Sequence, residues 1–186
     1  MKKVSPSLKG NLLLDSGMLA GSCFHRTVLL ICEHNAKGAM GLVLNRPVGQ
    51  KVGEVINRKI GLTLSNQPVY MGGPVQTQLL SWLQYDEFLP DANVMDNLKL
   101  GHALKELAEL SEGFSSTSRV KIFAGYAGWS PGQLDGELKN GAWLVHPAGM
   151  DMIFDPGGDD MWKGILRKMG TRHQLTADMP DHPEWN

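Results

Sequence analysis

Cysteine, long apolar runs and a surplus of charge of either sign are all scarce in this sequence. Its 186 residues include 2 cysteines, too few for the disulfide framework of a small secreted domain. No apolar run approaches the roughly 20 residues of a membrane-spanning helix. The three leucines at residues 12–14, behind a basic start, are not typical of a signal peptide. We therefore expect a cytoplasmic protein without a membrane segment.

The charge balance bears on the class of partner. The formal net charge is −1, with 18 Lys and Arg against 19 Asp and Glu. This argues against a charge-driven nucleic-acid surface, although a local basic patch is compatible with it. The sequence also shows no helix-turn-helix pattern and no basic recognition helix. Direct binding of nucleic acid is therefore not expected.

A chain of this length fits one domain, and the apolar patterns divide it into short elements. We expect one domain over residues 1–186, with residues 1–10 and the polar segment 171–186 loosely held. Residues 27–33 and 39–45 predict a β-hairpin with its turn at 34–38. The other expected strands are 11–15, 69–71, 79–83, 120–124 and 143–145, and the expected helices are 52–59, 96–110 (capped by Asp96), 131–139 and 159–169.

Residues 120–147 read as a strand, a corner rich in glycine and aromatic residues, a short helix and a second strand. Ser130 is placed to cap the helix, and Gln133 to complete a capping box. Gly141 marks the end of the helix. The order strand, helix, strand favours a parallel pair with a right-handed crossover. Because the helix is short, a mixed sheet is favoured over a doubly wound one.

The same stretch contains Gly-Trp-Ser-Pro-Gly at residues 128–132, which matches the nucleophile elbow of α/β-hydrolases. That elbow uses the backbone N–H after the serine for its oxyanion hole, and Pro131 has none. Ser130 is therefore interpreted as a helix cap, whose loss to alanine would cost about 1 kcal/mol. Glycines 125, 128 and 132 precede a helix, but the absence of Lys or Arg from residues 125–137 disfavours phosphate binding.

Cysteine and histidine alternate twice, at Cys23 and His25 and again at Cys32 and His34. This spacing matches no zinc pattern, and Cys32 lies in a strongly apolar strand, where a thiol behaves as a small hydrophobe. We expect no metal and no cofactor. A redox-sensitive pair of Cys23 and Cys32 remains an alternative.

Three long segments resemble one family of bacterial proteins. FHRTVLLICEHNAKGAMGLVLNRPVG, VYMGGPV and GYAGWSPGQLDGELKNGAWL are similar, in order and spacing, to the AlgH/YqgE family. The resemblance extends from about residue 12 to residue 170. It implies one α/β (α+β) sandwich domain with a mixed, bent β-sheet flanked by short helices. It also implies a cytoplasmic protein with no established enzyme activity, although some members carry the label of transcriptional regulator. Any regulation would then be indirect.

The first functional hypothesis is a non-enzymatic regulatory or interaction protein, a monomer or weak oligomer, that binds an unknown protein partner. Its shallow cleft would be bordered by the hairpin turn, the Gly-Gly-Pro corner and the corner before the short helix. Tyr126 and Trp129 would be either anchors for the partner or part of the core. The candidate binding residues are His34, Asn35, Asn45, Arg46, Gly72, Gly73, Pro74, Tyr126, Trp129, Gln133 and Glu137.

The second hypothesis is an enzyme or a small-ligand-binding protein. It would use His34, Arg46 and Glu137 as acid–base or anion-orienting groups. It requires a closed pocket that holds these three side chains within hydrogen-bonding distance of one another.

Overall fold

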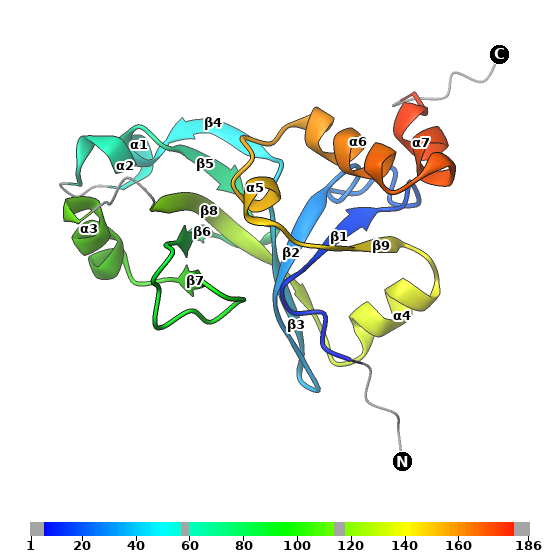
Figure 1. The fold of residues 1–186 in the computed structure, drawn as a ribbon, viewed down its shortest axis with the longest axis horizontal. Coiled ribbons are helices and arrows are strands. Elements are labelled where there is room, and N and C mark those ends of the chain that lie inside the picture. Colours follow the sequence, from blue (N-terminus) through cyan, green and yellow to red (C-terminus); the bar gives the residue numbers. More distant parts are fainter. Residues whose placement is uncertain (1–5, 57–59, 114–117, 181–186) are drawn as a thin grey trace.

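The computed structural model describes residues 6–56, 60–113 and 118–180, and within these ranges nine strands form one sheet (Figure 1). The strands are β1 (Asn11–Asp15), β2 (Val28–Asn35), β3 (Gly38–Val43), β4 (Pro47–Lys51), β5 (Pro68–Met71), β6 (Val75–Tyr85), β7 (Leu98–Gly101), β8 (Arg119–Trp129) and β9 (Trp143–Pro147). The helices are α1 (Val52–Val55), α2 (Leu62–Ser65), α3 (Leu104–Glu112), α4 (Gln133–Lys139), α5 (Met150–Ile153), α6 (Asp159–Lys168) and α7 (Thr171–Asp178).

The long strand β8 joins the two halves of the sheet. The order is β4-β5-β8-β3-β2-β1-β9, and β6 pairs with both β8 and β7. The first half of β8 pairs with β5 and β6, and its second half pairs with β3. The β5–β8 pair is parallel and the other pairs of named strands in the described chain are antiparallel. The prediction of a single mixed α/β domain with short helices is therefore confirmed.

The β-hairpin of β2 and β3 is confirmed, but the predicted crossover is wrong. β9 is not a neighbour of β8; it pairs antiparallel with β1, with Leu12 opposite His146. The connection through α4 therefore carries the chain from the middle of the sheet to its far edge. Residues 125–129 belong to β8 rather than to a corner, because Gly125 accommodates an irregularity in the β6–β8 pairing with a φ of 70°.

The helix predicted to begin at Asp96 is also wrong at its start. Leu98 and Leu100 are buried in β7 on either side of half-buried Lys99, and this strand pairs with residues 82–85 of β6. The helix α3 begins only at Leu104. The spacing of leucines at 100, 104 and 107 imitates a helical stripe, although the first of them is a strand residue.

Three apolar clusters form the core, and the sheet separates the first from the second. Leu12 and Leu30 belong to the first cluster, which α6 completes with Trp162. Leu13 and Leu29 alternate with them and point to the second cluster, which α4 covers. The third cluster lies under α1, α2 and α3, against β5, β6 and β8. Figure 1 shows α1, α2 and α3 at one end of the molecule and α4, α6 and α7 at the other.

The start of α4 differs from its prediction. Its N-cap residue is Gly132, with a φ of 74°, and Ser130 is exposed. The Gln133 N–H donates to the carbonyl of Ser130 at 3.0 Å, which closes a type II turn with proline and glycine in its two central positions. The Ser130 N–H donates to Oε1 of Gln133 at 3.0 Å, so the back-bond predicted for Gln133 is present. The cap predicted for Ser130 is wrong.

A helix, α7, occupies the first part of the segment for which we expected a loosely held tail. Its Ala177 is buried in the first cluster. Just after the helix, the carbonyl of Met179 accepts a hydrogen bond from Nη2 of Arg26 at 2.5 Å. No helix in the described part of the chain is long and apolar enough to cross a membrane.

Candidate functional site

The structure brings the predicted cleft segments together, but as closely packed backbone. A Cβ atom on Gly73 would lie 2.2 Å from the carbonyl carbon of Tyr126, and one on Gly72 would lie 2.3 Å from the carbonyl oxygen of Gly125. Gly73 and Pro74 do line a cavity, together with Arg46, but its volume is about 20 Å³. That space is suited to a water molecule rather than to a ligand. These glycines therefore allow two chain segments to cross closely.

Glu137 holds two buried tryptophans together. Its Oε2 accepts hydrogen bonds from Nε1 of Trp129 at 2.9 Å and from Nε1 of Trp143 at 2.7 Å. Its Oε1 accepts one from Nε2 of Gln133 at 3.0 Å. The Trp129 side chain is only 7% exposed and packs edge-on against Trp143 in the second cluster. Trp129 is thus a core residue and not an exposed anchor.

His34 and Asn35 shape the end of the β2–β3 hairpin. Nδ1 of His34 accepts a hydrogen bond from the Leu8 N–H at 3.0 Å, and its carbonyl accepts one from the hydroxyl of Ser7. The Asn35 side chain accepts one from the Lys37 N–H at 2.8 Å, an Asx-turn contact. Both residues have local structural roles.

Asn45 and Arg46 fasten the end of β3 to the loop before β2. Asn45 is fully buried; its Oδ1 accepts from the Val28 N–H at 2.9 Å and its Nδ2 donates to the carbonyl of Arg26 at 2.9 Å. Nη2 of Arg46 donates to the carbonyl of His25 at 2.5 Å. The three side chains of the second hypothesis, at positions 34, 46 and 137, are therefore each engaged in a different structural contact.

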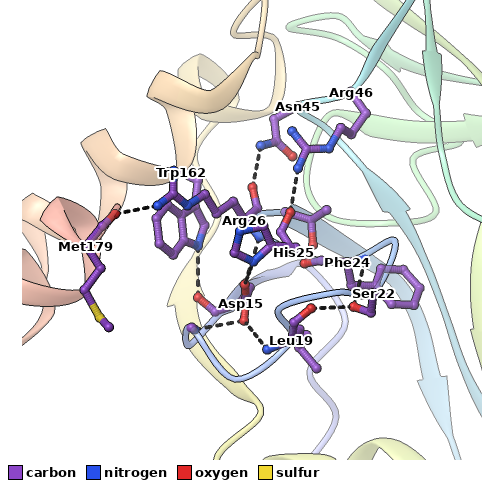
Figure 2. Close-up of polar contacts among 12 residues, drawn as sticks. Asp15, Leu19, Ser22, Phe24, His25, Arg26, Asn45, Arg46, Trp162 and Met179 are labelled. Carbon is purple, nitrogen blue, oxygen red and sulfur yellow. Dashed lines mark hydrogen bonds and ion pairs between the residues drawn. The ribbon is translucent and has the colours of Figure 1, made fainter. Parts of the chain in front are cut away.

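Reasoning from sequence missed a buried carboxylate, shown in Figure 2. Asp15 is fully buried at the end of β1, where it accepts hydrogen bonds from the N–H groups of Gly17, Leu19 and Arg26 at 2.8–3.1 Å. Its carbonyl accepts a hydrogen bond from Nε1 of Trp162 at 2.9 Å. Asp15 thereby fixes the loop between β1 and β2 and attaches α6 to it. The available signal was a carboxylate directly after three fully apolar strand residues.

A second buried charge lies under the loop between α5 and α6. Nζ of Lys121 donates to the carbonyls of Ile153 at 3.3 Å and Asp155 at 2.6 Å, and lies 4.1 Å from the centre of the Tyr70 ring. The Tyr70 hydroxyl donates to the carbonyl of Pro156 at 2.8 Å. Burial lowers the pKa of Lys121 to about 7, although the nearby Asp155 opposes that shift.

The two thiols have opposite surroundings. Cys23 is exposed and Cys32 is fully buried, and neither forms a disulfide. Burial raises the pKa of the Cys32 thiol far above its ordinary value, which keeps it in the unreactive thiol form. Cys32 is therefore a poor partner for Cys23 in a redox-sensitive pair.

None of the predicted site residues lines the largest cavity in the described part of the chain. It has a volume of about 750 Å³, and we call it the β4–β6 groove because its walls come from those strands and from the start of α3. Four of its apolar side chains are solvent-exposed by 36–53%: Val48, Met71, Leu79 and Leu104. The described lining residues include no Asp, Glu, Lys or Arg, and its polar members are Gln50, Thr77, Gln78 and His102.

A second cavity, of about 320 Å³, adjoins this groove, and we call it the β3–β6 pocket. It shares Leu79, Leu80 and His102 with the groove. Its other lining residues include Met40, Leu42, Tyr126 and, as a charged member, Glu33. Tyr126 is the one predicted site residue that faces this space. Neither cavity could be predicted from the sequence, because their walls come from segments far apart in the chain.

Comparison with known proteins identifies the family. The model of the AlgH-like family matches residues 12–174. The chain belongs to the AlgH-like family. A UPF0301 protein of Chlorobium luteolum is 37% identical over 180 residues, which span 95% of this chain and 94% of that protein. A UPF0301 protein of Chlorobaculum parvum is 38% identical over 180 residues, 95% of each chain.

Solved structures of the AlgH-like fold agree with this membership. The solution structure of AlgH from Pseudomonas aeruginosa is 30% identical, with a TM-score of 0.73, and the match covers 98% of this chain and all of that one. The crystal structure of a Corynebacterium diphtheriae protein is 26% identical, with a TM-score of 0.75 over 96% of this chain and 95% of that one. The resemblance to AlgH-like proteins inferred from the three sequence segments is confirmed.

Proposed function

We propose that this AlgH-like protein is an interaction protein that binds an apolar segment of a partner protein in the β4–β6 groove. The observation that carries the proposal is the convergence of Val48, Met71, Leu79 and Leu104 on one cavity while each remains substantially exposed. Contiguous exposed apolar side chains of this kind mark interaction sites. The volume of about 750 Å³ also lies within the range of about 300–1,000 Å³ that is usual for binding sites.

A peptide suits the polar part of the lining. Gln50 and Gln78 are exposed and offer side-chain amides, each with both a donor and an acceptor. Thr77 adds a hydroxyl of the same versatility. Such groups can satisfy the N–H and C=O groups of a peptide backbone, which a purely apolar molecule does not carry.

This proposal assigns no catalytic step to the protein. The contacts of His34, Arg46 and Glu137 with Leu8, His25 and the two tryptophans support structural roles for all three. We place the protein in the cytoplasm, as a monomer or weak oligomer, and any effect on transcription would act through the bound partner rather than through contact with DNA.

The test begins with selection from a phage-displayed library of random linear peptides against the intact protein. Enriched peptides are synthesised, and their affinities are measured by fluorescence anisotropy. Leu79→Glu should weaken them by about tenfold or more, since the added carboxylate must be desolvated in an apolar wall. Leu175→Glu is the matched control, because Leu175 is 74% exposed on α7 and lines neither cavity. Failure to enrich any peptide, or affinities that Leu79→Glu leaves unchanged, would contradict the proposal.

A further inference from the structure

Four of the eleven residues of β6 have no partner in the ladders of the described sheet. On one side, β7 pairs with Trp82 to Tyr85. On the other side, the β8 partners pass from Val75 directly to Leu80. The intervening residues 76–79 pair with neither strand in these registers, and all four are exposed. They form an exposed bulge opposite Gly125, which begins at Gln76 with a φ of 49°. Their sequence, Gln-Thr-Gln-Leu, carries no charge or proline of the kind that usually blocks strand pairing at an edge.

The two cavities lie on opposite faces of the sheet beside this bulge. The β4–β6 groove borders the third cluster through Leu80 and Ala124. The β3–β6 pocket borders the first cluster through Leu42 and Tyr126. They meet at three residues that line both cavities, Leu79, Leu80 and His102. A chain laid along residues 77–80 therefore has one cavity on each side of it.

We propose that the partner segment binds as an added β-strand along residues 77–80 of β6, with its side chains entering the two cavities alternately. This inference rests on the proposed function and specifies its mode of binding. Successive side chains of a strand point to opposite faces, and strand addition obtains affinity from main-chain hydrogen bonds and specificity from pockets for alternate side chains. The bound sequence is therefore apolar at every second position, at those that enter the β4–β6 groove.

The peptide side chains that alternate with these apolar ones enter the β3–β6 pocket, whose lining is different. The β3–β6 pocket combines apolar Met40 and Tyr126 with the exposed carboxylate of Glu33. A lysine or arginine fits such a place, because its aliphatic stem packs on apolar side chains while its charged end reaches the carboxylate. The segment thus alternates large apolar residues with at least one basic residue.

An N-methyl scan of an enriched peptide tests the strand directly and needs no protein variant. In an added strand, alternate N–H groups point toward β6, so methylation should weaken binding by about tenfold at every second residue of the paired stretch and little at the residues between. Uniform small effects along a peptide that still depends on Leu79 would overturn strand addition and leave the proposed function intact. Absence of any peptide that depends on Leu79 would overturn both.

A charge reversal tests the second half of the inference. Glu33→Lys should weaken basic peptides by several-fold and reverse their preference over matched peptides with glutamate in place of the basic residue. Glu87→Lys is the control, because Glu87 is exposed but lines neither cavity. Equal effects of the two substitutions would overturn the assignment of Glu33.

Discussion

Glu137→Ala should be among the most damaging single substitutions of a partly exposed residue in this protein. It removes the acceptor for two indole N–H groups, on Trp129 and Trp143, which are 7% and 4% exposed. A buried donor left without a partner costs about 1–3 kcal/mol, so the two together cost about 2–6 kcal/mol. The bond from exposed Gln133 adds little, since water can replace it. A domain has only about 5–15 kcal/mol of stability to lose.

Urea unfolding followed by far-UV circular dichroism measures this loss, and avoids tryptophan fluorescence that the substitution itself alters. Glu137→Gln keeps one carbonyl oxygen for the indoles and should lose about 1–2 kcal/mol, because it removes the charge from these hydrogen bonds. Glu109→Ala is the control: this side chain is 65% exposed in a surface ion pair with Lys105, and its loss should change stability by less than about 0.5 kcal/mol. A cost below about 1 kcal/mol for Glu137→Ala would refute a structural role for this carboxylate.

Lys121, the start of α4 and the two thiols each provide a further prediction. Burial lowers the pKa of Lys121 from 10.5 to about 7. Between pH 7 and pH 10.5 the unfolded chain therefore binds more protons than the folded chain. The free energy of unfolding should rise with pH over this range, by at most about 1.4 kcal/mol per pH unit. In urea titrations at several pH values Lys121→Met should show a smaller rise, and an unchanged slope would contradict the assignment. Ser130→Ala should change stability by less than about 0.5 kcal/mol. Gly132→Ala should cost about 1–2 kcal/mol, because the φ of Gly132 is 74°. If thermal unfolding ranks the two variants in the reverse order, Ser130 is a helix cap after all. Ellman's reagent should titrate only Cys23 rapidly in the native protein and Cys32 only after denaturation, and two fast native thiols would show that the core opens there.

A buried strand and an amphipathic helix were the elements best predicted from the sequence. Leu12, Leu13 and Leu14 form a short, wholly apolar run, and the structure buries all three. The helix that carries Trp162 was equally clear, because its apolar residues recur at helical spacing on an otherwise polar segment. In both cases the local pattern and the tertiary environment agree, so a reading of neighbouring residues was sufficient.

Failures arose where distant segments determine the outcome. The sequence left open whether Trp129 is an exposed anchor or part of the core, because its environment depends on Glu137 and Trp143, which enclose it. The β4–β6 groove depends on residues such as Val48 and Leu104 that meet only after the sheet has formed. No local pattern encodes that convergence.

The placement of β1 has a consequence for how the molecule is completed during synthesis. One neighbour of β1 emerges from the ribosome soon after it, but the other is β9, whose His146 lies opposite Leu12. Trp162, which donates to the end of β1, emerges later still. Among the described strands, β1 is synthesised first but gains its second neighbour only when β9 has been made. A nascent chain halted before residue 143 therefore carries an apolar strand with one edge free to pair with another strand.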